Sequence, residues 1–189
     1  SGACERGEDF IFICYDNEAY MNTGVQRSGT TPQGVLTTTT PISGKKQKNK
    51  DVPAIMAAHG IPYVATASPA YPLDLYDKIK KAKTISGPKY IHVHTPCPSG
   101  WGFNPRYTLK IGRLAVESGL YDLYENENGR FELSSPSSRL LKKERRPVSE
   151  YLETQTRFKG FSDARIAAIQ EEVDAKWETY RKEAECGII

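Results

Sequence analysis

Apolar runs and amphipathic segments alternate along the first two-thirds of the chain, and this alternation predicts strands separated by helices. The run FIFICYD (10–16) is continuously apolar over its first half, which is typical of a strand buried on both faces. The runs IPYVATAS (61–68) and GPKYIHVHTPCP (87–98) predict two further strands.

Three segments predict the intervening helices. In residues 51–60, Asp51 can cap the free N–H groups of the first turn and Gly60 can end the helix. Residues 71–83 are amphipathic, with lysines in the last turns, where they suit the helix dipole. Residues 104–119 predict another helix. Strand–helix–strand alternation of this kind implies an α/β fold with a parallel sheet, here over residues 1–115.

The pattern changes after about residue 115. Two alternating runs flank Asn128-Gly129, a strong signal for a two-residue hairpin turn. A charged segment broken by Pro147 follows, and then a long helix from Ser162. Its apolar residues recur at helical spacing: Ile166, Ile169, Val173, Trp177 and Tyr180. We interpret residues 116–189 as a hairpin and helical extension, an arm that packs on something else.

Ligands of parallel α/β sheets bind at the carboxyl ends of the strands. Three segments should therefore converge at one edge of the sheet: Asp16–Gly34, Ala67–Pro69 and Thr95–Gly100. The first is dense in amides and hydroxyls and has few groups that could form a core. It therefore marks the expected functional edge.

Composition limits the classes of function. The 189 residues are 38% hydrophobic and 26% charged, as in an ordinary globular protein, and a net charge of +3 is too small to argue for nucleic acid. No apolar run suggests a membrane span or a signal peptide. The four cysteines are far apart and form no CxxC pair, which indicates a reducing, cytoplasmic location. The start SGACERGEDF has no initiator Met and looks like a helix end that feeds a strand, so the chain seems to begin in mid-domain.

Residues that follow the first strand could hold a cation and a phosphate. Asp16 and Asn17 offer side-chain oxygens, and free backbone carbonyls lie nearby, a donor set that suits Mg²⁺. Asn22, Thr23 and Gly24 add donors and a close backbone approach, which a diphosphate would use. The alternative is an ordinary turn rich in Asn and Gly.

Other residues leave alternatives open. Cys97 lies between two prolines that hold its thiol rigidly, so it could be a nucleophile, a soft-metal ligand or an inert half-buried thiol. Cys14 is expected in the core. His92 and His94 share one face of a strand and could be half of a zinc site, but no third ligand is apparent. The basic stretch Ser43–Lys50 is a solvated loop or, alternatively, a recognition site for anions.

The run CYDNEAYMNTGVQRSGTTPQG (14–34), followed by TTTTP (37–41), resembles the thiamin-diphosphate-binding subunit of 2-oxoacid:ferredoxin oxidoreductases. Among these it is most similar to the beta subunit of the pyruvate:ferredoxin oxidoreductases. The match continues in order through KKQKNKDVPAIMAAHGIPYVATAS, GPKYIHVHTPCPSGW and the tail from RRPVSEYLETQTRFKGF. It covers essentially the whole chain and corresponds to the carboxyl-terminal portion of that subunit.

The resemblance implies a fold and a set of roles. The fold would be the carboxyl-terminal part of a doubly wound parallel-sheet domain that binds thiamin diphosphate. The Asn17 side chain and the Ala19 backbone carbonyl would bind Mg²⁺, and Asn22 would be the catalytic residue beside the cofactor. Asp16, Thr23, Gly24 and the other polar residues of the loop would line the cofactor and substrate pocket. Cys97 would be one ligand of a [4Fe–4S] cluster.

The same resemblance implies an activity. It is the oxidative decarboxylation of pyruvate with coenzyme A, with electrons passed to ferredoxin. The partners would be ferredoxin and subunits of the alpha, gamma and delta types. The family's Gly-Asp-Gly segment, three further cysteines and the glutamate that activates the thiamin are absent from this chain. We therefore expect uncovered apolar surface and no activity of the chain alone. Three alternatives remain: another 2-oxoacid (oxalate, branched or aromatic), a thiamin enzyme without ferredoxin, and a non-catalytic interaction module.

Overall fold

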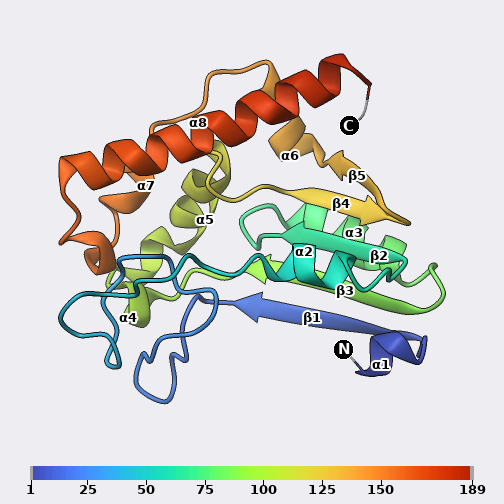
Figure 1. Cartoon of the computed structure of the whole chain (residues 1–189), viewed down its shortest axis with the longest axis horizontal. Coiled ribbons are helices and arrows are strands. Elements are labelled where there is room, and N and C mark those ends of the chain that lie inside the picture. Colours follow the sequence, from blue (N-terminus) through green and yellow to red (C-terminus); the bar gives the residue numbers. More distant parts are fainter. Residues whose placement is uncertain (1, 188–189) are drawn as a thin grey trace.

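The computed structural model describes residues 2–187 and shows a layered α/β architecture around one mixed sheet (Figure 1). Its strands are β1 (Phe10–Asp16), β2 (Tyr63–Ala67), β3 (Pro88–His94), β4 (Tyr124–Glu127) and β5 (Arg130–Leu133). They lie in the order β1-β3-β2-β4-β5. The first three neighbours are parallel, and β4 and β5 add an antiparallel pair beside β2. The α/β class and the parallel pairing of the three early strands are confirmed.

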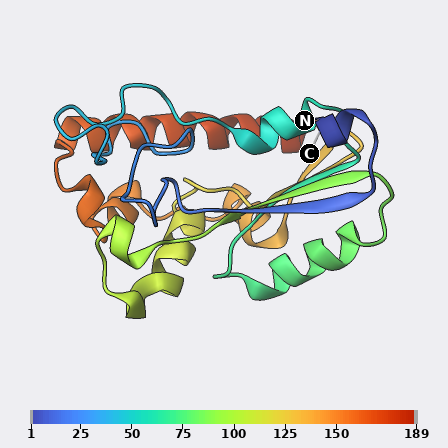
Figure 2. The ribbon, with the colours of Figure 1, turned by 90° about the horizontal axis from the view of Figure 1, so that it is seen from below.

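Helices cover both faces of the sheet. The described α-helices are α1 (Gly2–Glu5), α2 (Val52–Ala57), α3 (Pro72–Ala82), α4 (Pro98–Trp101), α5 (Thr108–Glu117), α6 (Ser135–Ser138), α7 (Val148–Leu152) and α8 (Asp163–Glu185). Short 3₁₀ turns occupy Pro105–Tyr107, Arg139–Leu141 and Thr156–Phe158. Figure 2 shows α2 and α8 on one side of the sheet and α3 and α5 on the other, which is a doubly wound arrangement.

Local signals account for several of these boundaries. The Asp51 carboxylate accepts a hydrogen bond from the Ala54 N–H at 2.9 Å, as expected of a helix cap. Asn128 and Gly129 both have positive φ angles (51° and 85°), which a two-residue hairpin turn requires. The Ser162 hydroxyl accepts from the Arg165 N–H at the start of α8. The predicted helices, the hairpin and the third strand, β3, are therefore confirmed.

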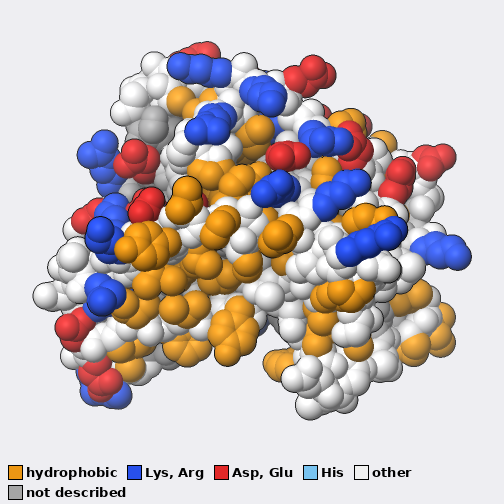
Figure 3. Space-filling model, turned by 180° about the vertical axis from the view of Figure 1, so that it is seen from behind, with side chains coloured by type: hydrophobic (Ala, Val, Ile, Leu, Met, Phe, Trp, Pro, Cys, Tyr) orange, Lys and Arg blue, Asp and Glu red, His pale blue; other side chains and the backbone are white. Residues whose placement is uncertain are grey.

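Two predictions about packing were wrong. The first strand is not buried on both faces: β1 pairs only with β3 within residues 2–187, and Phe12 and Tyr15 are 55% and 75% exposed. Its apolar run therefore belongs to a strand at the edge of the sheet. Figure 3 shows apolar side chains gathered on the face that carries α3 and α5. Ile13 and Tyr15 of β1 and Leu73 of α3 are among the exposed large apolar residues. This uncovered apolar surface was expected.

The extension is not an arm that reaches away from the domain. The hairpin β4–β5 joins the sheet through β2, and α8 packs back on the same domain. Trp177 of α8 is fully buried, and its indole N–H donates to the Gly119 carbonyl at 3.0 Å. The apolar stripe of α8 therefore finds its partners within the chain, in a core that also holds Trp101 and Ile111. No helix within residues 2–187 has the length and apolar character needed to cross a membrane.

Trp177 provides a test of this packing. We expect Trp177→Ala to lower the free energy of unfolding by about 3–5 kcal/mol, because it empties a fully buried site and removes an indole hydrogen bond. Denaturant-induced unfolding measures the change. Leu73→Ala is the control, since Leu73 of α3 is 78% exposed. Equal stability of both variants would contradict the docked position of α8.

Candidate functional site

The segments that follow β1 and β3 lie against each other, as expected, and β2 ends beside β3. The Thr95 N–H donates to the Asp16 carbonyl at 2.9 Å, which joins the ends of β1 and β3. A Cβ atom added to Gly100 would come within 2.1 Å of the Met21 sulfur, so α4 lies directly against the loop after β1. Glycine at this position permits that close approach.

A tight turn presents the residues at the tip of the loop. Tyr20 and Gln26 exchange backbone hydrogen bonds of 3.0 and 3.2 Å, and the Val25 N–H donates to the Met21 carbonyl. Val25 has a φ angle of +60°, a conformation that a β-branched residue rarely adopts. Asn22, Thr23 and Gly24 are exposed at the tip. Within residues 2–187, the N–H groups of Asn22 and Thr23 donate no hydrogen bond, so they are available to an anion.

Two oxygens at the base of the loop are also available. Within residues 2–187, neither the Asn17 side-chain amide nor the Ala19 carbonyl makes a hydrogen bond. The Asn17 backbone carbonyl is different, because it accepts from the Trp101 indole N–H at 2.8 Å. Oxygens of this kind are ligands for Mg²⁺, which usually keeps several waters and binds substrate phosphates as well. The residues present therefore fit part of a magnesium site.

Asp16, in contrast, is turned toward the protein. Its carboxylate accepts hydrogen bonds from the Glu18 N–H and the Thr30 hydroxyl, both at 2.8 Å, and lies 3.2 Å from His92 Nε2. Although burial opposes ionisation, these contacts hold the pKa of Asp16 below its ordinary value. Burial likewise opposes protonation of His92, yet hydrogen bonding with Asp16 and Cys14 raises the pKa of His92 to about 9. Asp16 thus shapes the loop through a buried ion pair with His92.

Glu18 is a half-buried charge of the loop, with a side chain 18% exposed. Its carboxylate lies against the Arg157 guanidinium, whose side chain is only 5% exposed. Burial raises the pKa of Glu18, and Arg157 opposes that shift. Next to this pair, burial and the Arg157 charge lower the pKa of His94 to about 3, so His94 is neutral. The sequence pattern did not identify Glu18, Arg157 or Trp101, because the ion-pair partners are 139 positions apart.

Several hydroxyls of the loop build the loop itself. Buried Thr31 accepts from the Ser28 N–H at 2.9 Å and donates to the Glu18 carbonyl. The Lys45 ammonium donates to the carbonyls of Gly29 and Thr31 at 2.7 Å, and burial lowers the pKa of Lys45. The prediction that the whole basic stretch is solvated was wrong at Lys45, because two carbonyls of the neighbouring loop hold it in the interior.

Cys97 directly precedes α4 and is half-buried, with its sulfur 3.6 Å from the Ser99 hydroxyl. All four cysteines are free thiols. Among residues 2–187, no group of three or more His, Cys, Asp or Glu side chains could hold a metal ion. The zinc alternative for His92 and His94 therefore gains no third ligand. Cys97 supplies one thiol where a cluster needs several, so these residues by themselves do not fit an iron–sulfur cluster.

A cavity of about 640 Å³ opens between the sheet, the loop and α8. Its wall includes the half-buried side chains of Asp16 and Glu18 and the buried side chains of His92 and His94. Lysines of both parts of the chain and aromatic residues of the extension complete it. The Nδ1 atom of His94 is buried and makes no hydrogen bond within the described chain. The loop and the extension therefore enclose a shared polar space.

Comparison with known proteins shows what this chain is similar to. Residues 1–93 match the family model described as "Thiamine pyrophosphate enzyme, C-terminal TPP binding domain". Over 93% of its length, the chain is 52% identical to pyruvate synthase subunit PorB of Methanothermobacter marburgensis. It is 46% identical, over 98% of its length, to ketoisovalerate oxidoreductase subunit VorB of Pyrococcus furiosus. The chain therefore resembles the thiamin-diphosphate-binding subunits of the 2-oxoacid:ferredoxin oxidoreductases.

The chain spans about 60% of the length of each of these relatives. Among solved structures, a 2-oxoglutarate:ferredoxin oxidoreductase from Magnetococcus marinus aligns with 51% of this chain and 33% of its own. That alignment has 27% identity and a TM-score of 0.49.

The ion pair of His92 predicts a pH dependence of stability. Because the pKa rises from 6.5 to about 9 on folding, the stabilisation from protonated His92 is complete below pH 6.5 and is lost as the pH rises through about 9. The difference in free energy of unfolding between the wild type and His92→Gln should therefore shrink from about pH 7 to about pH 10.

Denaturant unfolding across this pH range measures that difference. His59→Gln is the matched control, because His59 is exposed beyond α2 and its difference from the wild type should stay constant. A His92→Gln difference that is equally constant would contradict the ion pair.

Proposed function

We propose that this chain is the carboxyl-terminal part of the cofactor-binding subunit of a 2-oxoacid:ferredoxin oxidoreductase. The observation that carries the proposal is the loop after β1. It presents two unused oxygens, of Asn17 and Ala19, and free N–H groups at Asn22 and Thr23, within a chain 52% identical to PorB. In this proposal residues 1–115 form the cofactor-binding part and residues 116–189 the extension.

The loop residues would divide the work of holding the cofactor. The Asn17 amide and the Ala19 carbonyl would bind Mg²⁺, and the backbone at Asn22, Thr23 and Gly24 would bind the diphosphate. Asn22, exposed at the tip, would be the catalytic residue that orients cofactor and substrate. Bound thiamin diphosphate supplies an electron sink for the decarboxylation of a 2-oxoacid. Asp16 would support this loop from behind through its hydrogen bonds to Thr30 and His92.

Cys97 would be one ligand of a [4Fe–4S] cluster whose other thiols come from outside the described residues. The edge of the sheet that carries Cys97 would face the remaining parts of the complex. We take these parts to be alpha-, gamma- and delta-type subunits, with ferredoxin as the electron acceptor. We expect the complex in the cytoplasm, a reducing compartment, because all four cysteines are free thiols.

Pyruvate is the proposed substrate, with coenzyme A as the acyl acceptor, because four PorB relatives are 52–55% identical to this chain and the VorB relatives are 46–47% identical, although PorB of Pyrococcus horikoshii is only 40% identical. A branched 2-oxoacid is the second candidate, since the VorB relatives still share 46% of positions. The complete complex should therefore reduce ferredoxin with pyruvate and coenzyme A at a higher kcat/KM than with 3-methyl-2-oxobutanoate. A reversed order would favour the branched substrate, and failure to reduce ferredoxin with either would refute the proposal.

Cys97 can be tested separately from the thiamin site. In the complete complex, we expect Cys97→Ser to retain thiamin diphosphate binding, to lower the iron content by one cluster and to abolish ferredoxin reduction. Iron analysis and cofactor titration measure these effects. Cys186→Ser is the matched control, because Cys186 is exposed beyond the end of α8. Unchanged iron content in Cys97→Ser would rule out the ligand role.

A further inference from the structure

Arg157 belongs to the extension, yet its side chain ends in the loop after β1. The guanidinium pairs with the carboxylate of Glu18, and its other nitrogens donate to Gln155 Oε1 at 2.9 Å and to the Tyr151 hydroxyl at 3.2 Å. Its central carbon lies 3.7 Å from the ring centroid of Trp101. The guanidinium thus has three hydrogen-bond partners around its edge and an aromatic ring against its face.

Glu18 is fixed through its backbone as well as its side chain. Its N–H donates to Asp16 and its carbonyl accepts from Thr31. Its φ angle of +65° is one that side-chain-bearing residues seldom adopt, so the surrounding contacts must hold it. Glu18 stands between Asn17 and Ala19, the two residues whose oxygens would bind the metal.

Trp101 connects the same cluster to Asn17 from the other side. Its ring supports the Arg157 guanidinium, and its indole N–H donates to the Asn17 carbonyl at 2.8 Å. Trp101 is fully buried, so this hydrogen bond is shielded from water. The stacked pair of Trp101 and Arg157 therefore holds the backbone at Asn17 and at Glu18, the residue that leads to Ala19.

We propose that Arg157, stacked on Trp101 and paired with Glu18, is the positioning residue that sets the two metal-binding oxygens of the loop. This inference rests on the proposed function, since it concerns the same magnesium and thiamin diphosphate site. It assigns the extension a role in cofactor binding. Arginine suits this position because its planar fork can pair, donate to other groups and stack at once, and lysine cannot reproduce that combination.

The test is a Mg²⁺ titration of thiamin diphosphate binding in the complete complex, first stripped of metal and cofactor and followed by calorimetry. The wild type should require Mg²⁺, and Asn17→Ala should raise the Mg²⁺ concentration for half-saturation. In Arg157→Lys we expect this concentration to rise by about tenfold, the usual effect of losing a group that orients metal ligands.

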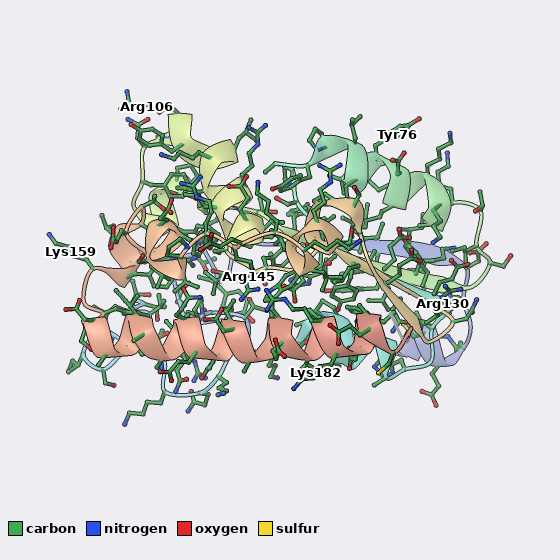
Figure 4. All side chains as sticks on the ribbon, turned by 90° about the horizontal axis from the view of Figure 1, so that it is seen from above. Tyr76, Arg106, Arg130, Arg145, Lys159 and Lys182 are labelled. Atoms are coloured by element: carbon green, nitrogen blue, oxygen red, sulfur yellow. The ribbon has the colours of Figure 1, made fainter. Side chains whose placement is uncertain are left out.

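Arg145→Lys is the matched control. Arg145 is also in the extension, has a side chain 9% exposed, pairs with Asp174 and lies over the Trp177 ring. Figure 4 shows it beside α8, and its side-chain hydrogen bond within the described residues goes to Asp174 of that helix. Both variants should lower the melting temperature, but only Arg157→Lys should change the Mg²⁺ requirement. Equal Mg²⁺ requirements in the two variants would overturn the positioning role.

The experiment distinguishes failure of the proposed function from failure of the positioning role alone. If the wild type binds thiamin diphosphate without regard to Mg²⁺, or Asn17→Ala has no effect, the proposed function fails. If both behave as expected and Arg157→Lys does not, only the positioning role fails.

A second variant applies if Arg157→Lys does not assemble. Trp101→Phe keeps an aromatic ring beneath Arg157, removes the hydrogen bond to Asn17 and leaves a small cavity. It should raise the Mg²⁺ requirement by roughly threefold or more, the value of one hydrogen bond. An unchanged requirement in Trp101→Phe would overturn the proposal.

Discussion

Glu18 carries a negative charge into the interior of the protein, and much of the surrounding structure compensates for it. Moving a carboxylate out of water is costly unless a partner charge and further hydrogen bonds replace the lost solvation. Arg157 supplies the charge, and Trp101 and Tyr151 supply the surroundings of Arg157. Because Arg157 comes from the extension, the extension is one of the supports that hold the shape of the loop after β1.

The extension, residues 116–189, is thus structurally linked to the first part of the chain, residues 1–115. By composition the extension is a charged tail that follows an α/β domain. In the structure it adds two strands to the sheet, covers one face with α8 and closes the far wall of the cavity beside the loop. The loop after β1 is thus held between the strand ends on one side and the extension on the other.

The elements defined by local chemistry were predictable from sequence. The Asp51 cap, the Asn128-Gly129 turn and the Ser162 start of α8 each depend on residues within a few positions, and each occurs as expected. Interactions between distant segments were not predictable. Neither residue of the Glu18–Arg157 pair carries a local signal. The apolar pattern of β1 could not distinguish a strand buried on both faces from a strand at the edge of the sheet, because either can carry a continuous apolar run.

The two edges of the sheet differ in a way that bears on handling the protein. At one end, β5 is short and exposes Arg130 and Glu132, charges that discourage another strand from pairing there. At the other end, β1 is longer and exposes Phe12 and Tyr15 beside a row of backbone groups unbonded within the described residues. Purified by itself at high concentration, the chain should therefore self-associate through β1, and a partner that pairs with this strand should keep it dispersed.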